Sequence, residues 1–237
     1  MYHSIYIGDK NTWDDFHLIP NSRPVVAEPD PRTMYINVYG NDGDLDATES
    51  RTGDVQYKNR EGSWDFTVAN DYENWEVLHH KIANYLHGKK FKIILEDDPN
   101  YYYIGRITFS EWNSDKNWSK VTLDYHLEPF KYELTSSLED WLWDPFSFET
   151  GIIREYGSIT VSGSYTLKIP GGRRPNVPSF TVNSSDGQGM TLTYKDRTYT
   201  LSDGTQRIRQ IVIGEEEETL VINGNGTISV SYQGGWL

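Results

Sequence analysis

Short runs of β-branched and aromatic residues, separated by turn-forming residues, recur along the whole chain and constrain its fold most strongly. Aromatic residues make up 14% of the 237 residues, and 20 glycines and 10 prolines interrupt the sequence. Only one stretch has the apolar spacing of a long helix. This pattern is typical of a mainly β protein, and the length suffices for one large domain or two modest ones with buried cores.

The one predicted helix lies between Asp71, a good N-cap residue, and Gly88, which suits a left-handed C-cap. One stripe of its surface is apolar: Trp75, Leu78, Ile82, Tyr85 and Leu86. Because these residues recur at helical spacing, we expect the stripe to pack on a sheet.

Strands are predicted on both sides of this helix. In the N-terminal part they span 2–7, 34–38, 63–68, 91–95, 101–109 and 118–132, and residues 96–100 form the turn of an antiparallel hairpin. In the C-terminal part they span 151–159, 164–169, 179–183, 190–194, 197–201, 206–213, 219–222 and 227–232. Even spacing with short turns is typical of a β-sandwich.

The sequence therefore predicts two domains. Residues 1–134 form a β-sandwich-like domain with one α-helix and a β-hairpin. Residues 135–148 form a linker, and residues 149–237 form a C-terminal β-sandwich.

Composition excludes several classes of function. The absence of cysteine excludes a disulfide scaffold, a thiolate zinc site and a cysteine nucleophile. A net charge of −13 disfavours the phosphate contacts on which nucleic-acid affinity rests, although an acidic wall beside passing DNA remains compatible. The chain has neither a secretory signal pattern nor about 18 consecutive apolar residues, so we expect a soluble protein that folds in a cytoplasm.

Asp42, Asp44 and Asp46 alternate as at the start of a calcium-binding loop. Such a loop needs glycine at its sixth position and a bidentate glutamate at its twelfth, and these positions hold Ala47 and Gly53. We therefore expect a solvated acidic turn that connects two strands and binds no metal.

No other motif supports catalysis. His79, His80 and His87 lack the spacing of a zinc protease helix, and no Gly-x-Ser-x-Gly elbow occurs. The Gly-rich run 171–174 opens no helix, and the four glutamates 215–218 are typical of a solvated hairpin tip. We predict no catalytic residues, no metal, no cofactor and no enzymatic activity.

Five blocks occur in order within residues 1–134. They are Gly8-Asp9-Lys10-Asn11-Thr12-Trp13, Gly40-Asn41-Asp42-Gly43-Asp44-Leu45-Asp46, Asn59-Arg60-Glu61-Gly62, Leu86-His87-Gly88-Lys89 and Asp97-Asp98-Pro99-Asn100-Tyr101-Tyr102-Tyr103-Ile104-Gly105-Arg106. Together they resemble the distal tail protein (Dit) family of long-tailed phages and prophages of Gram-positive bacteria.

The resemblance implies a structural ring, usually a hexamer, between the tail tube and the tail-tip hub with its receptor-binding proteins. The N-terminal domain would build the ring around a lumen through which DNA passes without specific binding. The C-terminal domain, galectin-like or carbohydrate-module-like in this family, would project outward toward receptor-binding proteins or cell-surface glycans. The protein would then lie in the virion tail tip after assembly in the host cytoplasm, with Asp42, Asp44 and Asp46 at a subunit or tube contact.

A second interpretation remains open at this point. The C-terminal half is also compatible with a carbohydrate-binding β-sandwich that contacts the bacterial surface. Aromatic residues available to stack on sugar rings are Tyr165, Tyr194, Tyr199, Tyr232 and Trp236.

Overall fold

The structure is a computed structural model that describes residues 3–68, 75–114, 119–134, 137–138 and 156–237. The chain divides into two compact units, residues 1–131 with residue 237, and residues 132–236. Each unit has its own hydrophobic core. The expected linker 135–148 falls almost entirely outside the described residues, so its extent stays a prediction.

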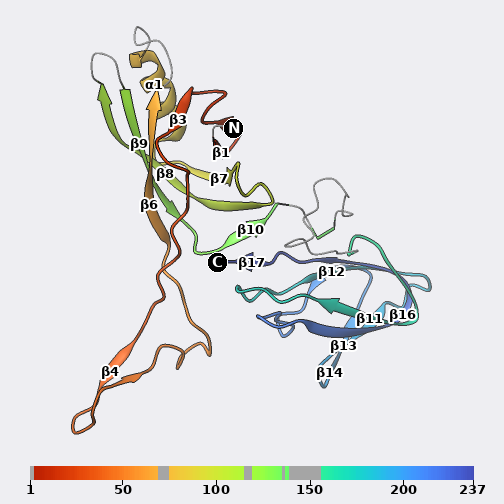
Figure 1. The fold of residues 1–237 in the computed structure, drawn as a ribbon. Coiled ribbons are helices and arrows are strands. Elements are labelled where there is room, and N and C mark those ends of the chain that lie inside the picture. Colours follow the sequence, from red (N-terminus) through yellow and green to blue (C-terminus); the bar gives the residue numbers. More distant parts are fainter. Residues whose placement is uncertain (1–2, 69–74, 115–118, 135–136, 139–155) are drawn as a thin grey trace. The chain divides into compact units, whose positions relative to one another are not determined.

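The first unit is a sheet of antiparallel strands with one helix (Figure 1). The strands up to the helix are β1 (Ile5–Ile7), β2 (Lys10–Asn11), β3 (Leu18–Pro20), β4 (Tyr35–Asn37), β5 (Asp44–Asp46) and β6 (Arg60–Val68). The helix α1 spans Trp75–Leu86, and β7 (Lys90–Leu95), β8 (Tyr101–Ser114) and β9 (Ser119–Leu127) follow it. The order in the sheet is β2-β1-β7-β8-β9-β6-β3, while β4 and β5 form a separate hairpin. A short strand, β10 (Lys131–Glu133), spans the boundary between the units.

The helix lies where the apolar stripe predicts it. Trp75, Ile82 and Leu86 are buried in the core of the first unit, and Leu78 and Tyr85 pack against that core. The helix ends at Leu86, and Gly88 just beyond it has a positive φ of 73°, which suits a residue that terminates a helix. The Gly88 N–H donates to the carbonyl of Ile107 on β8 (2.8 Å), which ties the helix end to the sheet. Asp71 lies outside the described residues. No helix in the described ranges is long and apolar enough to cross a bilayer.

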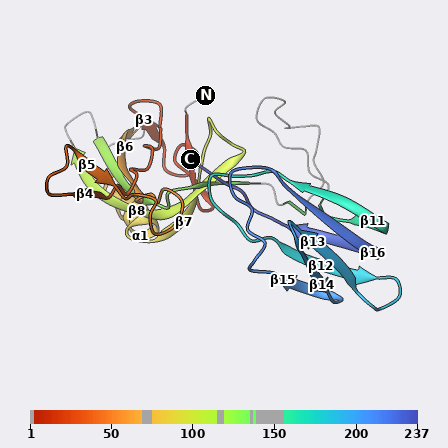
Figure 2. The ribbon, with the colours of Figure 1, turned by 90° about the horizontal axis from the view of Figure 1, so that it is seen from below.

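The second unit is a six-stranded sheet of antiparallel strands. Its strands are β11 (Ile159–Ile169), β12 (Ser179–Ser184), β13 (Met190–Tyr194), β14 (Arg197–Leu201), β15 (Gly204–Arg207) and β16 (Glu218–Ser231), and β17 (Gly235–Trp236) follows near the C-terminus. The central strand β16 pairs with β11 over the full length of β11, and the two run side by side in Figure 2. Along β16, β13 pairs with residues 220–223 and β12 pairs with residues 226–231.

Several strand boundaries predicted in this unit are wrong. Residues 219–222 and 227–231 belong to one strand, β16, so the break expected between the two predicted strands does not form. Gly224 and Gly226 both have φ of 143°, which other residues rarely adopt. A Cβ at Gly226 would lie 2.3 Å from the carbonyl oxygen of Asn183. These glycines therefore permit close approach of neighbouring backbone, and they do not mark a turn.

A glycine within a strand also explains why β11 is one strand where the sequence predicts two. Gly163 lies directly opposite Gly224, so the strand continues through the Ser-Gly-Ser sequence from residue 159 to residue 169. The expected strand 206–213 also differs from the structure at both ends. The strand found there, β15, begins at Gly204 and ends at Arg207. Beyond it, Ile213 forms only an isolated bridge with Asn176.

Candidate functional site

Residues 28–59, which we call the arm, leave the first sheet between β3 and β6 and stand away from it (Figure 1). Along the arm two extended stretches run antiparallel. The Arg32 N–H donates to the Gln56 carbonyl (2.7 Å), and the Lys58 N–H donates to the Asp30 carbonyl (2.8 Å). At the far end β4 and β5 pair with each other and with no other described strand.

The β4–β5 hairpin has two chemically different faces. Its opposite pairs are Tyr35 with Asp46, Ile36 with Leu45, and Asn37 with Asp44. Since residues directly opposite one another share a face, Asp44 and Asp46 make one face acidic. Ile36 and Leu45 make the other face apolar.

This geometry corrects the expectation of an acidic turn. Asp42 lies in the connection between β4 and β5, but Asp44 and Asp46 are strand residues. The alternation of aspartates with Gly43 and Leu45 has the two-residue period of a strand, and that period prevailed over the turn propensity of aspartate. Within the described ranges no three His, Asp or Glu side chains gather as metal ligands.

Local hydrogen bonds orient both strand aspartates. Asp46 Oδ1 accepts from the backbone N–H and the hydroxyl of Thr48, at 2.9 and 2.5 Å. These two bonds hold the pKa of Asp46 below its ordinary value. Asp44 Oδ1 accepts from Asn37 Nδ2 at 3.2 Å. The carboxylate of Asp46 is therefore ionised at neutral pH and held in place.

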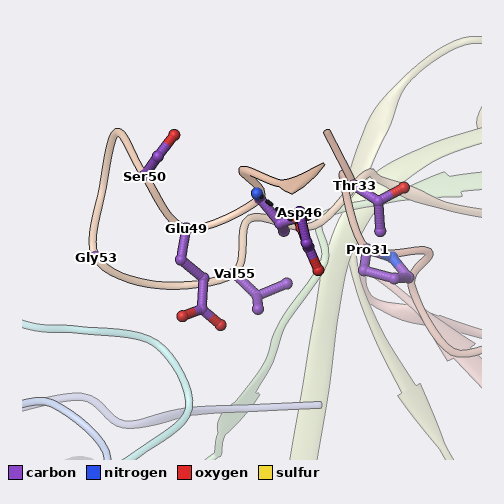
Figure 3. Close-up of a pocket in the computed structure, with 8 residues that line it drawn as sticks. Pro31, Thr33, Asp46, Glu49, Ser50, Gly53 and Val55 are labelled. Atoms are coloured by element: carbon purple, nitrogen blue, oxygen red, sulfur yellow. Dashed lines mark hydrogen bonds between the residues drawn. The ribbon is translucent and has the colours of Figure 1, made fainter. Parts of the chain in front are cut away.

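A hollow of about 660 Å³ lies beside the hairpin (Figure 3). Its lining residues are Pro31, Thr33, Asp46, Thr48, Glu49, Ser50, Gly53 and Val55. In Figure 3 the carboxylates of Asp46 and Glu49 lie on either side of Val55. The hollow therefore combines an apolar floor with two carboxylates, which is suited to holding a side chain of another protein.

Large apolar side chains of the arm are exposed to solvent. Tyr35 is 59% exposed, Leu45 is 56% exposed and Tyr39 is fully exposed. An isolated two-stranded hairpin is marginally stable in water, and exposed apolar patches of this kind mark interaction surfaces. These exposed side chains make the arm a candidate interaction surface.

Three side chains of the sheet, which we call the clasp, hold the chain where it enters the arm. They are Arg60, Trp64 and Tyr125. Arg60 donates from Nε to the Pro129 carbonyl (2.7 Å) and from Nη1 to the Ala27 carbonyl (2.9 Å). Trp64 Nε1 donates to the carbonyl of Val25 (2.8 Å). The Tyr125 hydroxyl accepts from the Ala27 N–H (3.0 Å). The clasp fixes the direction in which the arm leaves the sheet.

Sequence reasoning missed the clasp. Arg60 is 1% exposed, although an arginine in an alternating strand is normally assigned to the solvent face. One available signal was Gly62, where a Cβ would lie 2.3 Å from the Tyr125 hydroxyl. A strand glycine can indicate such a close approach, but it does not identify the neighbour.

Neither the scan of protein families nor the search of curated proteins finds a match to this chain. Among solved structures, the chain is similar to the SPP1 Dit (gp 19.1) protein, described as a paradigm of the hub adsorption apparatus in phages that infect Gram-positive bacteria. The two are 16% identical, with a TM-score of 0.63, over 98% of this chain and 99% of that one. This chain has the Dit fold. The expectation of a mainly β chain is thereby confirmed for both halves, and the one expected helix lies in the first half.

The Dit fold leaves few of the aromatic residues considered for sugar stacking available. Tyr194 and Tyr232 are core residues, 6% and 3% exposed, and Tyr199 packs against the same core. Trp236 is half-buried and donates from Nε1 to Glu133 (3.1 Å). Only Tyr165 of this set is exposed, so the five do not form one sugar-binding platform.

Three of the four glutamates 215–218 form ion pairs with lysine or arginine side chains. Lys168 pairs with Glu217 and Lys195 pairs with Glu218, both at 3.0 Å, and Arg173 pairs with Glu215. The expectation of a hairpin tip is wrong, because β15 pairs with β12 and not with β16, and Glu218 is already the first residue of β16.

Proposed function

We propose that this chain is a structural distal tail protein, without catalytic activity, that joins the tail tube to the tail-tip hub and receptor-binding proteins. The observation that carries the proposal is its likeness to the SPP1 Dit structure over nearly the full length of both chains. That likeness includes both units, so the proposal concerns the whole chain. In this function the protein lies in the virion tail tip and is assembled in the host cytoplasm.

We further propose that the chain forms a ring, a hexamer, around the path of the DNA. The exposed two-faced hairpin supports this, because a contact between two different surfaces of identical chains generates a ring when the rotation between copies closes. In this arrangement Asp42, Asp44 and Asp46 lie at the contact between subunits or with the tube. The net charge of −13 is compatible with a lumen that does not retain DNA.

The ring proposal is tested by the mass of the purified full chain. Light scattering over a range of concentrations should reach a particle of six times 27.4 kDa, and negative-stain images should show rings with a central opening. A chain that stays monomeric at every concentration, with or without a tail tube protein, contradicts the ring. Labelling of intact virions with an antibody should place the protein at the tail tip.

A further inference from the structure

A group of exposed cations lies on β7 and β8 of the first unit. Lys90 is directly opposite Arg106 in the antiparallel register, and Lys92 lies two residues further along β7. We call these three residues the basic row. Like charges directly opposite each other in a sheet repel and are unfavourable. Nearby carboxylates would reduce this repulsion.

Only one member of the row has an acidic partner among the described residues. Lys90 Nζ donates to Glu128 Oε1 at 2.7 Å. Arg106 donates from Nη1 to the carbonyl of Gly88 (2.8 Å), and the Lys92 ammonium lies 4.1 Å from the centre of the Tyr102 ring. Two of the three cations therefore have no carboxylate beside them in the described part of the chain.

The arm has the opposite imbalance. Residues 28–59 contain seven acidic and three basic side chains. Two of the acids pair with a cation in the structure, namely Glu28 with Arg60 and Asp30 with Lys58. The carboxylates of the hairpin and of its hollow have no cationic partner in the described ranges: Asp42, Asp44, Asp46 and Glu49.

The two charge imbalances cannot meet within one chain. The hairpin pairs with no other described strand, and Figure 1 shows it standing far from β7 at the end of the arm. The clasp and the hydrogen-bonded stretches of the arm hold it in that direction. A second molecule is therefore needed to bring the acidic arm and the basic row together.

We propose that the acidic face of the arm docks on the basic row of an adjacent copy of this chain. The carboxylates of Asp44, Asp46 and Glu49 then face Lys90, Lys92 and Arg106 of that copy. The hollow has room for an aliphatic lysine or arginine stem over Val55, with the charged head between Asp46 and Glu49. This contact rests on the proposed ring and names the two surfaces that close it.

Charge complementarity of this kind sets the register of a contact and excludes wrong partners. The carboxylates select the position of the arm on the adjacent copy, and the apolar face, on the opposite side of the hairpin, is left to bury its area against a further surface of the assembly. Since the two surfaces differ, every copy offers one arm and one row, and such head-to-tail contacts form a ring when the rotation between copies closes.

Charge reversal tests the docking. We expect D44K/D46K and K92E/R106E, each alone, to require at least about tenfold higher concentration than wild type to assemble, as measured by sedimentation. A mixture of the two variants should assemble again, because the reversed arm of one fits the reversed row of the other. The alternating ring formed in this way contains equal amounts of both chains, which mass spectrometry of the isolated particle reports.

The control variant K120E/R209E makes the same change in net charge at two exposed cations outside the row, and it should assemble as wild type does. Thermal unfolding of each variant checks that the fold is intact. If wild type forms rings and the folded variants also assemble alone, or fail to assemble when mixed, the docking is wrong while the ring stands. If wild type itself never assembles, the ring and the docking are both overturned.

Discussion

Arg60 is the only charged side chain in the described ranges that is fully buried in the structure. Its guanidinium lies 5.5 Å from the centre of the Tyr103 ring and donates to two backbone carbonyls from different segments. Burial in this cluster raises the pKa of Tyr103 to about 12. One residue therefore joins β6, the entry of the arm and the segment after β9.

Replacement of this arginine is expected to be costly. Arg60→Leu removes two hydrogen bonds from a charged donor that is 1% exposed, those to the carbonyls of Ala27 and Pro129, which should lower the free energy of unfolding by about 3 kcal/mol. Urea denaturation measures the change. Arg51→Leu, on the exposed part of the arm, should change it by less than about 0.5 kcal/mol, and a similar loss in both variants would contradict the role of Arg60.

A second residue-scale prediction concerns pH. Asp97 accepts from Nδ1 of His3 and from Nε of Arg23, and these contacts hold the pKa of Asp97 below its ordinary value of 3.8. A carboxyl with a lowered pKa stabilises the fold above its unfolded pKa, and this contribution is lost as pH falls below about 4 through the folded value. The acid side of the stability profile should therefore be shallower in Asp97→Asn. An unchanged profile would show that the cluster contributes nothing to acid stability.

At the scale of elements, pairs of glycines keep the long strands of the second unit in contact. Gly163 and Gly224 lie opposite each other in the β11–β16 pair, and Gly226 approaches β12 closely. The sequence predicts turns at these positions, because glycine next to serine or asparagine is typical of hairpin loops. Long-range pairing decides otherwise, since the apolar residues on both sides share one core.

This assignment predicts the effect of a single methyl group. Gly226→Ala adds a Cβ 2.3 Å from the carbonyl oxygen of Asn183 at a φ that alanine rarely adopts. We expect a loss of about 2–4 kcal/mol in the free energy of unfolding. Gly214→Ala is the matched control, because its Cβ would meet nothing within 4 Å and its φ is not positive. Equal stability of the two variants would show that β16 does not pass this point as one strand.

At the scale of the whole molecule, the arm is the part that the proposed assembly explains best. Its hairpin exposes an acidic face and an apolar face, and the clasp fixes its exit from the sheet. A monomer gains little from such an element, because its apolar residues remain in water. In the proposed ring, neighbouring surfaces of the assembly would cover them.

The apolar face should therefore contribute to assembly without contributing to the stability of the monomer. Ile36→Ser with Leu45→Ser should raise the concentration needed for ring formation by at least about tenfold and leave the unfolding temperature of the monomer unchanged. Val212→Ser, at a side chain 40% exposed in the second unit, is the control and should assemble normally. Normal assembly of the double variant would place the contact elsewhere.

The sequence by itself determined the mainly β composition, the single helix with its apolar stripe, and the absence of a recognisable catalytic motif. These follow from local periodicity and residue type, which act over a few neighbouring residues. Only the tertiary structure decided that Asp44 and Asp46 belong to a strand, that Arg60 is buried, and that Gly224 and Gly226 continue β16. The strand of Asp44 and Asp46 depends on pairing with the nearby residues 35–37, which the turn propensity of aspartate concealed. The other two depend on neighbours distant in sequence, and neither propensity nor spacing along one chain specifies which distant residues those will be.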